Sequence, residues 1–140
     1  CYRSLYQPYL KPTKGLLNFL SQAHRFNIPM CIGTSASQEN VDFIINGLGI
    51  SHYFKSILDD RSVNKGKPHP EIYKKCAQSI GLPNKQCFVF EDARSGIEAG
   101  KAAGSKVIAL AIKNEKSALN ADLVINDFSE INVQTLFDLL

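Results

Sequence analysis

The chain has 140 residues, of which 44% are hydrophobic and 21% charged, and its formal net charge is +3. This size and balance predict one globular domain that buries roughly 68% of its unfolded surface. The few excess basic residues are scattered, which gives no indication of a nucleic-acid partner. No apolar run approaches the ~20 residues of a membrane span, so no membrane partner is expected. Cys31, Cys76 and Cys87 fall in apolar segments without a Cys-x-x-Cys unit, a pattern typical of reduced thiols in a cytoplasmic protein.

The first half of the chain alternates helical and strand-like segments. A helix is predicted from Pro12, because apolar residues recur there at helical spacing. Its apolar face is expected to carry five side chains: Leu16, Leu17, Leu20, Ala23 and Phe26. Residues 28–34 are predicted to form a buried strand. Ser37 is placed to cap a second helix that ends at Gly49, and a weaker strand is predicted at residues 54–58.

The second half continues the same alternation. The predicted elements are a helix from Pro68 to Gly81, a strand at 87–90, a helix at 95–103, strands at 107–112 and 122–125, and a closing helix at 131–140. Alternation of helices with continuously apolar strands predicts an α/β fold. We expect a three-layer, Rossmann-like parallel sheet with helices on both faces.

Polar residues follow three of the predicted strands. Ser35 follows the first, Asp59 and Asp60 the second, and Glu91 and Asp92 the third. In open α/β sheets, ligands bind outside the carboxyl ends of the strands, so these side chains can meet in one crevice. Each also has a plainer interpretation. Ser37 next to Ser35 can simply cap a helix, the acidic pair can simply face a helix dipole, and the two aspartates can form an ordinary turn.

Lys67 stands in the segment Gly66-Lys67-Pro68-His69-Pro70, where two prolines stiffen the chain beside it. A loop lysine is normally solvated, but this bracing favours a fixed role. An ammonium group of this kind can neutralise phosphoryl oxygens, and adjacent carboxylates such as Glu91 and Asp92 can hold a hard cation such as Mg²⁺. The sequence contains no Asp-x-Asp pair that could supply a nucleophile and a general acid to such a site.

Three segments together resemble motifs of a known family, the haloacid dehalogenase-like hydrolases. They are Thr34-Ser35-Ala36-Ser37, Gly66-Lys67-Pro68-His69-Pro70, and the stretch from Glu91-Asp92-Ala93-Arg94-Ser95-Gly96 to Gly104. In order and spacing they are similar to the second, third and fourth motifs of the family. The nearest subgroup is the β-phosphoglucomutase-like phosphatases and phosphomutases, and the likeness runs from Pro12 onward.

The resemblance implies Mg²⁺-dependent phosphoryl transfer through an aspartyl-phosphate. By this resemblance, Ser35 and the Ala36 backbone N–H would bind phosphoryl oxygens, and Lys67 would neutralise the phosphate and the nucleophile. Glu91 and Asp92 would bind or orient Mg²⁺. The implied partner is a small phosphorylated metabolite, for which a sugar phosphate is our first expectation and a nucleotide or pseudouridine phosphate the alternative.

The chain departs from the family pattern at its beginning. Members start with a strand that ends in Asp-x-Asp-Gly, followed by a helical cap, and neither is found here. Residues 1–10 are similar to the end of a cap helix and its linker, and residues 11–140 to the C-terminal part of the core domain. The absent strand would be the central one, between those ending at Ser35 and Glu91. We therefore expect this stretch alone to be inactive, and either to need an N-terminal segment or to self-associate. A non-catalytic phosphate-binding module remains the alternative of another class.

Overall fold

The computed structural model describes residues 14–110 and 120–140. The helices are α1 (Leu16–Arg25), α2 (Gln38–Leu48), α3 (Glu71–Ile80), α4 (Arg94–Ala102) and α5 (Val133–Leu139). The strands are β1 (Cys31–Gly33), β2 (Ser56–Leu58), β3 (Phe88–Glu91), β4 (Lys106–Leu110) and β5 (Leu123–Ile125). The expected cap helix end and linker at residues 1–10, and the last two residues of the strand predicted at 107–112, lie outside the described residues. No helix within the described ranges is long and apolar enough to cross a membrane.

Helix α2 begins and ends where local chemistry predicts, whereas α1 begins at Leu16 and not at the predicted Pro12, after Gly15 with its left-handed backbone. The Ser37 hydroxyl accepts a hydrogen bond from the Asn40 backbone N–H at 3.4 Å, and α2 ends at Gly49, whose φ of +67° is left-handed. Two residues predicted on the apolar face of the first helix are wrong. Leu17 is 47% exposed and Phe26, just after α1, is 60% exposed, whereas Phe19 is buried. In a helix of 3.6 residues per turn, Phe19 shares a face with Leu16 and Leu17 points away from it.

All the strands that pair are parallel, as predicted, but they form two sheets. One contains β1 and β2, and the other has the order β3-β4-β5. The expected single sheet is thus divided between β1 and β3. Within the described residues each of these two strands pairs along one edge only. The described parts of β1 and β3 therefore do not pair with each other.

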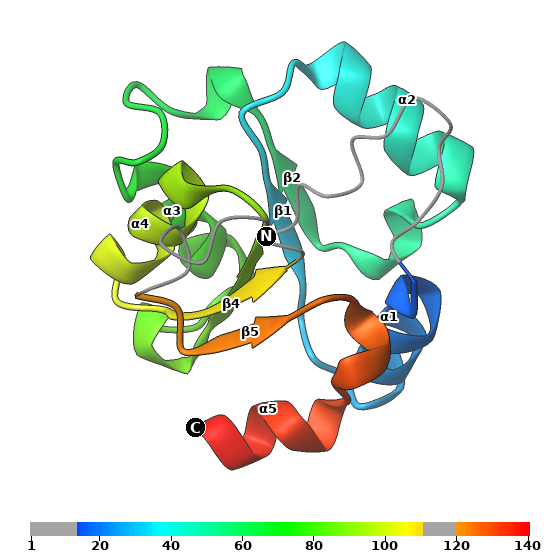
Figure 1. The fold of residues 1–140 in the computed structure, drawn as a ribbon. Helices are drawn as coiled ribbons and strands as arrows, with labels where there is room; N and C mark the ends of the chain where they lie inside the picture. Colours follow the sequence, from blue (N-terminus) through cyan, green and yellow to red (C-terminus); the bar gives the residue numbers. More distant parts are fainter. Residues whose placement is uncertain (1–13, 111–119) are drawn as a thin grey trace.

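Helices cover both faces of the strands, which confirms the predicted fold class. Strand β4 is buried on both sides: Val107 and Ala109 face the cluster that contains side chains of α3 and α4, and Ile108 and Leu110 face the cluster with α1, α2 and α5. Figure 1 shows α3 and α4 on one side of the strands and the other helices opposite. A strand covered on both faces is continuously apolar, as this one is.

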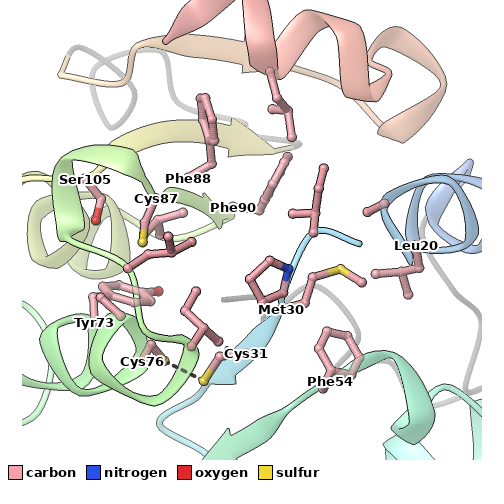
Figure 2. Close-up of a pocket in the computed structure, with 18 of the residues that line it drawn as sticks. Leu20, Met30, Cys31, Phe54, Tyr73, Cys76, Cys87, Phe88, Phe90 and Ser105 are labelled. Carbon is pink, nitrogen blue, oxygen red and sulfur yellow. Dashed lines mark hydrogen bonds between the residues drawn. The ribbon is translucent and has the colours of Figure 1, made fainter. Parts of the chain in front are cut away.

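An apolar cavity of about 130 Å³ lies where the two sheets stand apart. Met30 and Cys31 line it from the β1 side, and Phe88 and Phe90 from β3 (Figure 2). Phe19 of α1 closes part of it, with its ring centroid 5.4 Å from that of Phe90. The gap between the two sheets is therefore lined mainly with hydrophobic side chains.

Substitution of Gly15 tests how the start of α1 is held. Gly15 has a φ of +81°, and a Cβ there would lie 2.6 Å from the Ser129 nitrogen and 2.7 Å from the Phe128 carbonyl carbon. We expect Gly15→Ala to lower the free energy of unfolding by about 2–5 kcal/mol, the sum of ~1–2 for the left-handed backbone and ~1–3 for overpacking. The measurement is chemical denaturation.

The matched control is Gly49→Ala. Gly49 shares the left-handed φ, but a Cβ would meet nothing within 4 Å. This variant should lose only the ~1–2 kcal/mol of backbone strain. Equal losses in the two variants would contradict the packing of Gly15 against Phe128 and Ser129.

Candidate active site

A buried ion pair between Lys67 and Glu91 forms the centre of the site. The Lys67 Nζ lies 2.5 Å from the Glu91 Oε2, and the two side chains are 2% and 0% exposed. Lys67 Nζ also donates to the Gly33 carbonyl oxygen at 3.3 Å. The alternative of a solvated loop lysine therefore does not hold. Because Gly33 ends β1 and Glu91 ends β3, this one ammonium group bridges the two sheets.

Tyr73 of α3 also binds the Glu91 carboxylate, at the same oxygen as Lys67. Its hydroxyl donates to Glu91 Oε2 at 2.6 Å, and its ring centroid lies 4.9 Å from Lys67 Nζ. Burial, together with the negative charge of Glu91, raises the pKa of the Tyr73 hydroxyl well above its usual range. Tyr73 therefore remains a proton donor to Glu91. The contact of Tyr73 with Glu91 was not predicted from the sequence, where the available signal was a hydroxyl on an otherwise apolar helix face.

The loop before Lys67 is fixed by Glu71, in the first turn of α3. The Glu71 carboxylate accepts hydrogen bonds from the backbone N–H groups of Asn64 at 2.8 Å and Lys65 at 3.2 Å. The bond from Asn64 lowers the pKa of the Glu71 carboxyl below its usual value. The Lys67–Pro68 peptide bond is cis. Glu71 was not identified from the sequence.

Gly96 gives the Glu91 carboxylate the space that it occupies. A Cβ at position 96 would lie 1.7 Å from Glu91 Oε2, so no other residue fits there without moving Glu91. Gly100 has a different role: it lets α4 pack closely on the sheet, because a Cβ there would meet Val107 Cγ2 at 2.8 Å. Gly96 instead serves the site.

The residues that directly follow β1 and β2 lie at the carboxyl ends of these strands. Ser35 is exposed and directly follows the buried Thr34. The Ala36 backbone N–H, predicted to bind phosphate, donates here to Thr34 Oγ1 at 3.1 Å. Asp59, after β2, accepts a hydrogen bond from the Arg61 backbone N–H at 2.9 Å and caps a short 3-10 turn. The plainer interpretation of Asp59 as a turn residue agrees with this geometry.

Asp92 follows β3 and is half-buried just before α4. Its backbone N–H donates to Glu91 Oε1 at 3.2 Å. Both oxygens of Glu91 therefore carry hydrogen bonds. In the described part of the chain, no group of three or more His, Cys, Asp or Glu side chains could hold a metal ion. The structure thus joins Lys67 directly to Glu91, while Ser35 and Asp92 each lie just past a strand end.

This arrangement can be compared with known proteins. The family profile described as haloacid dehalogenase-like hydrolase matches residues 2–110, which is most of the chain. The chain belongs to this family. Its Lys67, Glu91 and Gly96 lie in the segments that resemble the third and fourth family motifs, so the buried ion pair is built from family-motif residues.

Its relatives include enzymes with stated activities. The chain is 32% identical over 124 residues to the beta-phosphoglucomutase of Bacillus subtilis, covering 89% of this chain and 53% of that protein. It is 38% identical over 80 residues to the fructose-1-phosphate phosphatase YqaB of Escherichia coli, covering 57% of this chain and 43% of that one. The chain spans about half the length of these curated relatives.

A solved structure supports the fold assignment independently. The HAD hydrolase, family IA, variant 3, from Entamoeba histolytica superposes with a TM-score of 0.83 at 32% sequence identity. The match covers 91% of this chain and 60% of that one. The separated strands described above therefore follow the architecture of the family.

Removal of the Tyr73 hydroxyl tests its hold on Glu91. We expect Tyr73→Phe to lower the free energy of unfolding by about 1.5–3 kcal/mol, the range for a hydrogen bond to a charged group. Tyr53→Phe is the control, since the half-buried Tyr53 hydroxyl makes no hydrogen bond with residues 14–110 or 120–140, and should change stability by less than ~0.5 kcal/mol. Denaturant titration measures both; an unchanged Tyr73→Phe would contradict the assignment.

Proposed function

We propose that this chain forms the main part of the catalytic core of a phosphatase or phosphomutase that acts on a small phosphorylated metabolite, a sugar phosphate in the first instance. The observation that carries the proposal is the buried Lys67 ammonium group at the carboxyl ends of the strands. Membership of a hydrolase family supports it, as do relatives named as a sugar-phosphate phosphatase and a phosphoglucomutase.

The proposed roles follow from charge and position. Lys67 neutralises the charge of the phosphoryl group, because its ammonium is fixed and shielded from water, where electrostatic stabilisation is strongest. Ser35 binds a phosphoryl oxygen from the exposed end of β1. The Ala36 N–H joins it by exchanging its bond to Thr34 Oγ1 for one to the phosphate. Phosphoryl transfer depends mainly on such positioning and neutralisation.

The acidic residues fit a Mg²⁺ cofactor in their donor chemistry. Carboxylate oxygens suit this hard cation, which usually takes only one or two protein carboxylates and keeps several waters. Glu91 Oε2 is already engaged by Lys67 and Tyr73, so Asp92 is the direct ligand and Glu91 orients Lys67. When bound, Mg²⁺ would neutralise further charge on the phosphoryl oxygens.

The nucleophile comes from outside this chain. Among the described residues, β1 and β3 each leave one edge unpaired, and the apolar gap lies between them, where a further strand could fit. Its carboxyl end would lie between Ser35 and Asp92, next to Lys67, which bridges the same two strands. A carboxylate there would form the aspartyl-phosphate implied by the family resemblance.

The decisive experiment begins with the coding sequence before Cys1. A strand ending in Asp-x-Asp-Gly is expected there. The protein that includes it should release phosphate from fructose 1-phosphate or β-glucose 1-phosphate, or isomerise the latter, in a Mg²⁺-dependent reaction. Preference for nucleotide monophosphates would replace the sugar-phosphate assignment. Binding of phosphate without turnover, or a start codon close to Cys1, would support the non-catalytic module instead.

Replacement of Lys67 tests its charge. In the whole protein we expect Lys67→Met to lower kcat/KM at least ~10²-fold, the scale for loss of one group that stabilises the transition state. Lys65→Met, in the same loop but exposed, should remain near the wild-type value. Because Lys67→Met also leaves Glu91 buried without its partner, circular dichroism must show that the assayed protein is folded. A folded Lys67→Met protein with near-normal kcat/KM would refute the role.

A pair of isosteric variants tests the metal assignment. Asp92→Asn should raise the Mg²⁺ concentration for half-maximal activity about 10-fold or more, because an amide oxygen lacks the charge of the carboxylate. Asp59→Asn should leave it unchanged, since asparagine also caps a turn. A Mg²⁺ titration of initial rates compares them. Equal metal requirements in the two variants would remove Asp92 from the site.

A further inference from the structure

Two cysteine side chains lie together on the wall of the cavity, away from the phosphate site. Cys31 of β1 and Cys76 of α3 have their sulfurs 3.1 Å apart, and the residues are 5% and 4% exposed. Figure 2 shows the two side chains pointing toward each other across the interface between strand and helix. Phosphoryl transfer as proposed above makes no use of either thiol.

We propose that Cys31 and Cys76 are a redox-active dithiol, which a hydroperoxide oxidises to an intramolecular disulfide. A disulfide bond is about 2.05 Å long, so the sulfurs need to approach by only about 1 Å from the 3.1 Å found here. Both cysteines are among the residues that line the apolar cavity beside β1. The proposal does not rest on the phosphatase assignment.

The surroundings divide the roles between the two sulfurs. The hydrogen bond with Cys76, and a further one from the Ser56 hydroxyl at 3.2 Å, lower the pKa of the Cys31 thiol to about 6 in spite of its burial. The hydrogen bond with Cys31, together with burial, raises the pKa of the Cys76 thiol. Cys31 is therefore the nucleophile, as a thiolate, and Cys76 is the thiol that resolves the intermediate.

The reaction balances in two steps. The Cys31 thiolate attacks one oxygen of the hydroperoxide, an S–O bond forms, the O–O bond breaks, and the leaving alkoxide takes a proton from solvent to become an alcohol. The Cys76 sulfur then attacks the Cys31 sulfenic acid. The S–S bond forms, the S–O bond breaks, and the departing hydroxide takes the Cys76 proton as water. The two thiols supply the two electrons that reduce the peroxide.

The bond would join the two elements that hold Lys67. Cys31 lies two residues before Gly33, whose carbonyl accepts from Lys67, and Cys76 lies one helical turn after Tyr73. A disulfide between them would also close the 45-residue span from β1 to α3. Closing that span restricts the unfolded chain, so oxidation should raise the midpoint of denaturation.

Peptide mapping tests the proposal under native conditions. The whole protein is treated with hydrogen peroxide, alkylated with N-ethylmaleimide and digested with trypsin without reduction. The sequence places Cys31, Cys76 and Cys87 in separate tryptic peptides, 26–55, 76–85 and 86–94. We expect peptides 26–55 and 76–85 to be joined, with a loss of two hydrogens that dithiothreitol reverses, while Cys87 remains alkylated. The guanidinium midpoint should rise on oxidation and return on reduction.

Cys87 provides the internal control. It is half-buried, burial raises the pKa of its thiol, and its sulfur donates a hydrogen bond to the Pro83 carbonyl oxygen at 3.4 Å. Cys87→Ser should still form the disulfide. Cys31→Ser should form no disulfide, and its guanidinium midpoint should not rise after peroxide treatment. The proposal is overturned if Cys31 and Cys76 stay fully alkylated in the treated wild type, if Cys31 overoxidises while Cys76 is alkylated, or if the crosslink contains Cys87 or a second chain.

Discussion

The site depends on one buried charge pair that spans the space between two sheets. An ammonium and a carboxylate removed from water lose much of their hydration energy, and their attraction compensates only if the remaining hydrogen-bonding positions are also filled. The Gly33 carbonyl, the Tyr73 hydroxyl and the Asp92 backbone N–H fill those positions around Lys67 and Glu91. Such a pair is a weak contributor to stability. Its value is that it fixes a positive charge at a strand end.

The fold supplies the positions from which that pair is built. Parallel strands bring their carboxyl ends to one edge, so β1 and β3 present Gly33 and Glu91 side by side, and the crossing connection through α3 returns Lys67 and Tyr73 to the same place. Helices on both faces exclude water from the strands, which keeps the pair dry. The apolar cavity lies between the same two strands, since residues of β1 and β3 line it.

Much of this could be predicted from the sequence because the signals are local. Apolar runs, helical spacing, Ser37 and the glycines after α2 and α3 define the elements. The rule for strand ends then gathers Ser35, Glu91 and Asp92, and the flanking prolines single out Lys67. The relationships across the chain were not accessible in this way. That Glu91 meets Lys67 and Tyr73 depends on contacts between distant segments that no periodicity encodes, and the gap between β1 and β3 was expected only from the family resemblance. Leu17 shows the limit even locally, because an apolar residue beside an apolar stripe need not belong to it.

The close approach of Gly96 to Glu91 couples the evolution of these two positions. A side chain at position 96 would occupy the place of the carboxylate. Glu91 Cγ would itself lie 2.6 Å from the added Cβ, so the acid would have to turn away from Lys67 and Tyr73 or be lost. Position 96 can therefore drift away from glycine only in company with position 91, and the two should change together among relatives even though neither lies next to the other along the chain.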